Sequence, residues 1–185
     1  MKAIRVVIFF CIFLILTHSS VNEKSKIIDK LNDIDNIKFE FTQTTNENIE
    51  KGICFLVFPN KLKCNYEDKN KKELIINKKM MAITQKRYGK TLFYPLSKST
   101  FINILSKDEL IKIIKGSDTF IDDYFNIVFM NELNSKTLIR FDKESFLLAG
   151  WISLDQYNNQ VTFEIEINYI NQMIDKKIFT LPNRN

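Results

Sequence analysis

Apolar and polar residues alternate along most of the chain beyond residue 36, which predicts β-strands with one buried face. The clearest case is Val161, Phe163, Ile165, Ile167 and Tyr169, which alternate with polar residues. Because successive side chains of a strand point to opposite sides, such a segment has one apolar and one polar face. The same reasoning predicts strands at residues 37–42, 49–58, 61–67, 74–76, 80–86, 120–131, 136–142, 146–154 and 161–169.

Two parts of the chain have the periodicity of a helix instead. At residues 24–34, the apolar residues lie three or four positions apart with charges between them. After Pro95, Ser97 or Ser99 can cap a short helix that runs through residue 105. A second short helix begins at Lys107 and is ended by Gly116 and Ser117. We therefore expect an N-terminal helix and two short helices that interrupt the strands.

These elements predict a mainly β protein with a few helices (α+β). Long antiparallel strands with one apolar face must bury that face. A strongly curved sheet that wraps around its own apolar side chains, and is closed by the helices, achieves this with few elements. Periodicity identifies the inward face but leaves open whether the interior is filled or hollow, and a filled core is the ordinary case.

The first twenty residues have the features of a secretory signal peptide. Lys2 and Arg5 precede an apolar run at residues 6–16 that is too short to span a bilayer, and small residues follow at 17–20. We expect residues 1–20 to be a signal peptide and residues 21–185 to form a single domain, exported to the periplasm or out of the cell. An uncleaved N-terminal anchor is the alternative. Cys11 lies inside the apolar run without small residues before it, which does not match a lipobox.

Charge does not favour a nucleic-acid partner. The formal net charge of +5 falls to +3 without Lys2 and Arg5. Lysines stand beside asparagines at residues 69–72 and 77–79, a pattern typical of strand edges and turns. Phosphate recognition favours arginine and a concentrated basic face. We therefore expect no nucleic-acid binding.

Cys54 and Cys64 are the two cysteines outside the leader, and export permits them to form a disulfide. The residues between them predict a strand, a turn at Pro59–Asn60 and a second strand. If the loop has three residues centred on Pro59, the two cysteines face each other across the hairpin. A register change of one residue would place them on opposite faces.

The sequence contains no constellation typical of catalysis or metal binding. The only histidine, His18, lies in the leader, so neither a Ser-His-Asp triad nor a two-cysteine metal site can be completed. Asp122 and Asp123 are neighbours on a predicted strand and would point to opposite faces. Glu164 and Glu166 share a solvent-facing side. We expect no enzyme activity, no cofactor and no metal, and we interpret Trp151 as a packing residue.

The order of several short motifs resembles the periplasmic outer-membrane lipoprotein carrier family (LolA-like). These motifs are Phe41-Thr42-Gln43 on the first strand, Gly52, the hairpin 58–66 around Pro59, the helical insertion after Pro95, the Asp155 turn and the closing Phe179-Thr180-Leu181-Pro182. The family usually has a basic residue before the hairpin proline, implied to help hold the lid closed, where this chain has Phe58. Cys64 stands at the usual tryptophan position.

The resemblance implies an incomplete antiparallel β-barrel whose apolar cavity receives lipoprotein acyl chains beneath a helical lid. The lipid-binding residues that it implies are Phe39, Phe41, Leu56, Phe58, Leu62, Tyr66, Phe125, Ile127, Phe129, Phe163, Ile165 and Ile167. The implied lid residues are Phe101, Ile104, Leu105, Leu110, Ile113 and Ile114.

The implied function is a periplasmic carrier that shuttles lipoproteins from the inner to the outer membrane. Its implied partners are lipoproteins, an inner-membrane lipoprotein-releasing transporter and an outer-membrane acceptor, and we expect a monomer. The alternative is a periplasmic half-barrel that acts as a sensor or scaffold and binds a partner protein.

Overall fold

The chain forms one antiparallel sheet of eleven strands. The computed structural model describes residues 23–96, 103–130, 136–155 and 157–183. The strand order is β6-β5-β4-β3-β2-β1-β11-β10-β9-β8-β7, so β6 and β7 are the free edges of an open sheet. The strands are β1 (Asn36–Thr45), β2 (Asn48–Val57), β3 (Lys61–Tyr66), β4 (Lys72–Asn77), β5 (Met80–Gln85), β6 (Lys90–Pro95), β7 (Asp118–Ile121), β8 (Phe125–Met130), β9 (Lys136–Phe141), β10 (Leu148–Leu154) and β11 (Gln160–Ile170).

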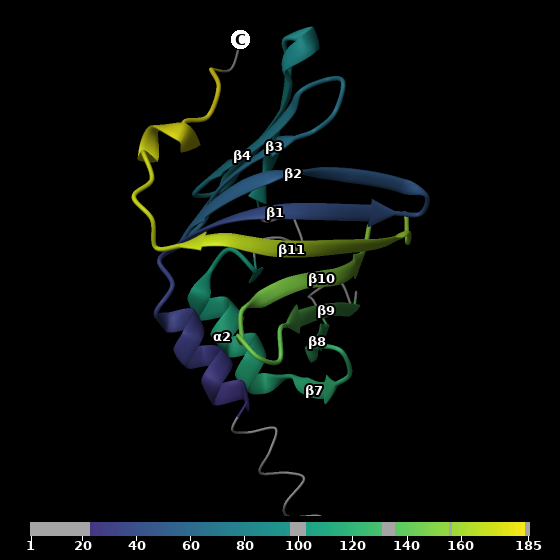
Figure 1. Cartoon of the computed structure of the whole chain (residues 1–185). Coiled ribbons are helices and arrows are strands. Elements are labelled where there is room, and N and C mark those ends of the chain that lie inside the picture. The colour runs from purple at the N-terminus through teal and green to yellow at the C-terminus, as the bar shows by residue number, and fades with distance from the viewer. Residues whose placement is uncertain (1–22, 97–102, 131–135, 156, 184–185) are drawn as a thin grey trace, which may run out of the picture.

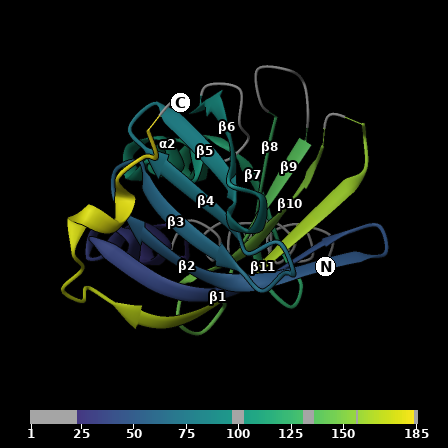
Figure 2. The same cartoon turned by 90° about the horizontal axis from the view of Figure 1, so that it is seen from above.

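Two helices lie against the concave side of the curved sheet (Figures 1 and 2). Residues 23–32 are helical, and α2 (Lys107–Gly116) begins after Ser106, whose side-chain oxygen accepts the backbone N–H of Glu109. Apolar residues of both helices, including Ile27 and Leu110, join the inward strand residues in one core. In the described part of the chain, neither helix is long and apolar enough to cross a bilayer.

The C-terminal segment lies against the other side of the sheet. The 3-10 helix η1 (Lys86–Tyr88) joins β5 to β6, whereas η4 (Lys176–Phe179) follows β11 and contacts β3 and β4. Phe179 is fully buried there, and its carbonyl oxygen accepts a hydrogen bond from Asn77 Nδ2 at 3.0 Å. This segment, yellow in Figure 1, therefore covers part of the convex face.

The predicted fold class is confirmed, and so are most of the predicted elements. Strand β6 was not predicted, because its Leu92-Phe93-Tyr94 run has no polar alternation. The strand predicted at 120–131 is wrong as a single element, since β7 and β8 are separate strands joined by a turn at residues 122–124. Asp122 Oδ1 accepts the N–H of Tyr124 at 2.8 Å, so the carboxylate predicted to lie on a strand stabilises this turn instead.

The first of the two predicted lid helices is described only at its end. Residues 103–105 form a turn there rather than an α-helix, whereas Ser97, Ser99 and Phe101 lie outside the described residues. The signal peptide predicted at residues 1–20 also lies outside them. The second predicted lid helix is α2, with the predicted end at Gly116.

Candidate functional site

A row of aromatic side chains crosses the concave face of the sheet. The Phe41 ring stacks on Phe163 and meets Tyr66 edge-on, with both pairs of ring centroids 4.9 Å apart. Phe163 in turn stacks on Trp151, with centroids 4.2 Å apart. The row thus joins strands β3, β1, β11 and β10, and it forms a continuous apolar floor.

Gly52 makes this row possible because it stands in β2 between Phe41 and Tyr66. The sheet register pairs Gly52 with both residues, one on each neighbouring strand. A Cβ atom built at Gly52 would lie 2.9 Å from the Phe41 ring and would overlap the carbonyl oxygen of Asn65. The absent side chain lets the two rings meet above β2.

The hairpin of β2 and β3 has the register that a three-residue loop centred on Pro59 predicts. Val57 pairs with Lys61, and Cys54 lies opposite Cys64. The two cysteines are joined by a disulfide on the concave face, and Cys64 borders the interior. The hairpin is therefore covalently closed beside the aromatic row.

Two side chains from the segment before α2 fill the space above this floor. Ile104 and Leu105 are 3% and 2% exposed, and only a cavity of about 20 Å³ remains between them and the sheet. A space of this size holds about one water molecule. We call residues 103–116 the lid. The cavity is lined by Ile37, Phe39, Leu56, Leu62, Cys64, Tyr66, Leu74, Ile104, Leu105, Leu148, Trp151, Phe163 and Ile165.

A second apolar cavity of about 20 Å³ lies beneath the N-terminal helix and α2. Leu31, Leu110 and Ile167 are among the residues that border it, together with Phe58. The two small cavities share Ile37 and Leu148. The apolar interior thus extends under both helices and is filled almost completely by their side chains.

Polar contacts hold the start of the lid to the hairpin of β2 and β3 and to the end of the N-terminal helix with the residues that follow it. The backbone N–H of Asn60 donates to the carbonyl oxygen of Leu105 at 2.9 Å. Lys107 Nζ donates to the carbonyl oxygen of Asn32 at 3.2 Å and lies 3.6 Å from the Asp35 carboxylate. The same Nζ is 5.7 Å from the centroid of the Phe58 ring. A lid lysine thus approaches the position where the family usually has a basic residue.

One end of the concave face is polar. Glu50 and Lys72 form an ion pair there, and Lys72 Nζ is 3.8 Å from the centroid of the Tyr66 ring. Burial, and then the nearby Glu50 and Asp68 carboxylates, raises the pKa of the Tyr66 hydroxyl above its usual range. The hydroxyl therefore stays protonated, so the apolar floor ends at a neutral phenol and an ion pair.

The structure brings most of the residues implied by the family resemblance into this interior. Phe39, Leu56, Leu62, Tyr66, Phe163 and Ile165 border the first cavity, and Phe58 and Ile167 border the second. Phe41 lies in the aromatic row, and Phe125 and Ile127 are fully buried in the core. Phe129 and Ile113 of the lid are partly buried against the core and also border a groove beside α2, whereas Leu110 and Ile114 are fully buried.

Several residues that border the first cavity are not among the predicted lipid-binding residues, chiefly Ile37, Leu74, Leu148 and Trp151. Ile37 stands at an inward position of an alternating strand, so alternation alone could have found it, whereas Leu74 lies in the apolar run 74–76, where the pattern does not say which side chains face inward. Trp151 is 5% exposed and both packs in the core and borders the cavity. Leu148 lies within the strand predicted at residues 146–154 and is the first residue of β10, and its position depends on the irregular pairing of β9 and β10.

These features define a class of protein: an open half-barrel whose apolar interior lies beneath a helical lid. Among the described residues, no three or more His, Cys, Asp or Glu side chains gather where they could hold a metal ion. Glu164 and Glu166 are both exposed, as their alternation with apolar residues predicts. The interior offers apolar contact rather than reactive groups.

A family model described as outer membrane lipoprotein carrier protein LolA matches residues 32–182. The chain therefore belongs to the LolA family, as its motif order indicated. A search of curated protein sequences gives no significant match.

Solved structures share the fold at very low sequence identity. An uncharacterized conserved protein from Thermus thermophilus is similar with a TM-score of 0.52 and 8% identity, over 85% of this chain and 93% of that chain. A DUF1329 family protein from Desulfovibrio piger has a TM-score of 0.50 and 7% identity, over 88% and 96%. MucB has a TM-score of 0.50 and 9% identity, over 87% of this chain and 63% of its own. Likeness at this level concerns the fold alone.

Proposed function

We propose that this protein is a periplasmic carrier that encloses the acyl chains of lipoproteins between the aromatic floor and the lid. It would receive lipoproteins from an inner-membrane releasing transporter and deliver them to an outer-membrane acceptor. The observation that carries the proposal is that lid side chains, rather than strand side chains alone, fill the concave face. An acyl chain can replace Ile104 and Leu105 there without exposing the floor to water.

Loading would be reversible because the acyl chain takes the place of the lid side chains in the interior. Each methylene group kept out of water is worth about 0.8 kcal/mol, so a bare acyl chain cannot remain in aqueous solution. Opening the lid exposes Ile104 and Leu105 and costs free energy, which offsets part of the gain from enclosing the chain. Lipid binding is thereby weak enough to permit release.

The lid would have to move before an acyl chain could enter the cavity between the lid and the sheet. A space of about 20 Å³ is too small for an acyl chain. The residues proposed to contact acyl chains are those that border the two cavities and the aromatic row, and α2 would move with the lid. The ion pair of Glu50 and Lys72 stands where the polar part of an amphiphile would lie.

The direct test is mass spectrometry of the protein purified from the cell envelope. Co-purified lipoprotein or acyl lipid supports the carrier. A protein that is consistently empty and binds no lipoprotein in vitro contradicts it. A partner protein that co-purifies without lipid would favour the sensor or scaffold instead.

A lid variant distinguishes a carrier from an ordinary filled core. Replacement of Ile104 and Leu105 by serine removes apolar contacts of the closed lid and raises the fraction of open molecules. Since apparent affinity scales with the competent fraction, a fluorescent fatty-acid probe should bind at least several-fold more tightly. Ile113→Ser is the control, because Ile113 lies in the lid but borders neither of the two small cavities. If neither wild type nor the lid variant binds the probe, the carrier proposal fails.

A further inference from the structure

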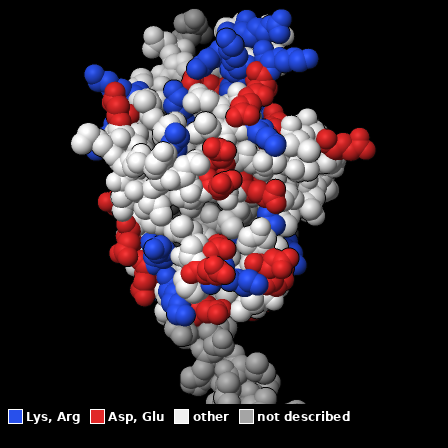
Figure 3. All heavy atoms as spheres, viewed as in Figure 1, with Lys and Arg blue, Asp and Glu red and all other residues white. Residues whose placement is uncertain are grey.

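Five exposed cations gather at one end of the molecule, where two turns far apart in the sequence meet. Residues 68–71 join β3 to β4, and η1 with Gly89 joins β5 to β6. The backbone N–H groups of Lys86 and Arg87 donate to the carbonyl oxygens of Lys71 and Asn70 at 3.4 and 3.2 Å. Figure 3 shows the resulting blue cluster at the top of the molecule, where Figure 1 places η1. We call it the basic tip; its exposed cations are Lys69, Lys71, Lys86, Arg87 and Lys90.

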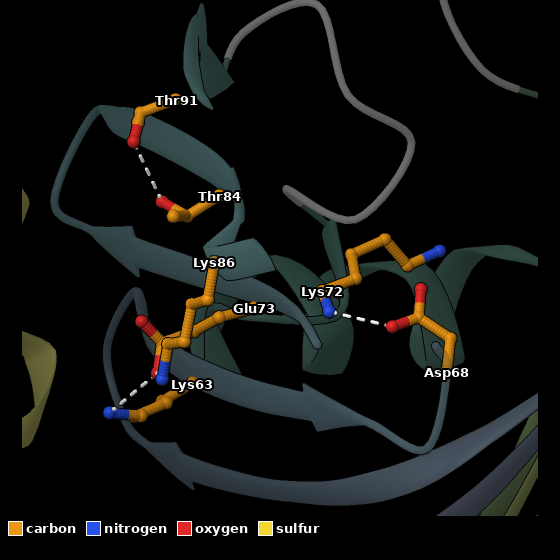
Figure 4. A network of polar contacts seen from close by, with 7 residues as sticks. All are labelled: Lys63, Asp68, Lys72, Glu73, Thr84, Lys86 and Thr91. Atoms are coloured by element: carbon orange, nitrogen blue, oxygen red, sulfur yellow. Dashed lines mark hydrogen bonds and ion pairs between the residues drawn. The ribbon is translucent and has the colours of Figure 1, made fainter. Parts of the chain in front are cut away.

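Nearby carboxylates neutralise only part of this charge. Glu73 is 7% exposed and lies on the sheet below the tip, 3.0 Å from Lys63 Nζ and 2.7 Å from Lys86 Nζ (Figure 4). The Asp68 carboxylate accepts the backbone N–H of Lys72 at 2.8 Å, and Glu67 is an exposed neighbour. The exposed surface of the tip is therefore net positive.

An aromatic side chain stands in the middle of these charges. Tyr88 is 63% exposed, and the Arg87 guanidinium lies 5.9 Å from the centroid of its ring. Tyrosine is enriched where a protein meets the headgroup layer of a bilayer, because its ring is apolar and its hydroxyl is polar.

We propose that the basic tip docks on an anionic phospholipid bilayer, with the cations on the headgroup phosphates and Tyr88 at the interface. Clusters of four to eight lysines and arginines are the composition that binds anionic lipid. Attraction to an anionic bilayer depends on how many lysines and arginines lie near its surface, so it does not need the bidentate geometry that favours arginine at a single phosphate. The tip projects away from the helices, so a flat surface can reach it (Figure 1).

The proposal does not depend on acyl chains entering the interior, and its test does not involve the interior. The protein is purified from the cell envelope in the form that the cell produces. It is mixed with vesicles of phosphatidylcholine alone or with about one-third phosphatidylglycerol, at about 0.1 M salt, and bound protein is measured by co-flotation. The readout is the ratio of binding to anionic vesicles over binding to neutral vesicles. An apolar N-terminal segment would raise binding to both kinds of vesicle and so would not change this ratio.

The tip variant replaces Lys69, Lys71, Arg87 and Lys90 by glutamine and keeps Lys86, which pairs with Glu73. We expect it to lose at least about tenfold in affinity for anionic vesicles, since each charge near such a surface strengthens binding several-fold. The matched control replaces four exposed lysines outside both the tip and the lid, Lys30, Lys136, Lys176 and Lys177. It removes the same net charge and should bind almost as wild type does. Circular dichroism checks that both variants are folded.

Salt gives a second measurement that needs no variant. Raising it to about 1 M shortens the screening length to about 3 Å and should remove the preference of wild type for anionic vesicles. The proposal is overturned if wild type shows no preference, or if the tip variant keeps it. It is also overturned if the control loses affinity equally, or if the tip binds polyglutamate but not anionic vesicles, which would indicate an acidic protein partner.

Discussion

At the scale of single residues, the aromatic row in the interior depends on a glycine as much as on the aromatic side chains themselves. Phe41 and Tyr66 meet only because Gly52 lies between them, and the Gly52 backbone approaches Asn65 too closely for any side chain. The sequence shows an isolated glycine in an apolar strand, which often marks close approach. Which rings meet above it depends on the register of three strands.

We predict that Gly52→Ala destabilises the protein by about 1–3 kcal/mol, because the new methyl group must displace backbone or the Phe41 ring. Urea unfolding measures this. Gly116→Ala is the control: a Cβ there meets nothing within 4 Å, and the position ends α2, so stability should be unchanged or slightly raised. Equal unfolding midpoints for wild type and Gly52→Ala would contradict this account of the aromatic row.

Glu73 should make stability depend on pH. Burial alone would raise the pKa of this carboxyl, but hydrogen bonds and charge from Lys86 and Lys63 outweigh burial and lower it below the ordinary 4.5. A lowered folded-state pKa contributes stability at neutral pH, and that contribution is lost as pH falls below 4.5 and through the folded-state value.

Glu73→Gln should therefore lower the urea midpoint at pH 7 and make its decline in acid shallower than in wild type. The exposed Glu144 provides the control, since Glu144→Gln should leave the curve of midpoint against pH unchanged. Parallel curves for wild type and Glu73→Gln would show that the two lysines do not stabilise the carboxylate.

At the scale of elements, the hairpin of β2 and β3 supports both the floor and the lid. Its disulfide closes a loop with a sequence separation of 10, and its turn supplies the Asn60 N–H that holds Leu105. We predict that replacing Cys54 and Cys64 by serine costs about 2–4 kcal/mol of unfolding free energy. Reductant should lower the urea midpoint of wild type and leave that of the double variant unchanged. A wild type insensitive to reductant, with its thiols shown to be free, would exclude a structural role for the bond.

Elements with strong periodicity were predictable, and those without it were not. Strands β1 and β11 alternate cleanly, and α2 has an N-cap, an apolar face and a terminal glycine, so local sequence specifies each. Strand β6 exists because it pairs with β5, and the boundary of β7 and β8 depends on the Asp122 carboxylate, which accepts the backbone N–H of Tyr124. Both depend on interactions that hydrophobic periodicity does not report.

At the scale of the whole molecule, the lid and the floor are two halves of one apolar interior. The floor contains strands that are far apart in sequence but adjacent in the sheet, such as β1 and β11. The lid joins the outer strands of one half of the sheet to those of the other half. A lid in this position can open without breaking the sheet ladders.

If an acyl chain replaces the lid side chains, hydrogen exchange should show it. We predict faster amide exchange in residues 103–116 when an acylated lipoprotein is added, with β1 and β11 remaining protected. The same polypeptide without acyl chains is the control and should change nothing. Bound acylated lipoprotein with unchanged exchange in the lid would contradict lid opening.

The sequence alone determined the mainly β class, the inward face of most strands, the second lid helix and, through its motif order, the family. These are local or order-dependent properties, so they can be read from hydrophobic periodicity, capping residues and the succession of motifs. Tertiary structure decided that Ile104 and Leu105 fill the interior, that Phe129 borders a groove beside α2 rather than either small cavity, and that the turns at 68–71 and 86–90 form one basic tip. Each of these depends on distances between segments remote in the chain, which only sheet pairing and packing determine.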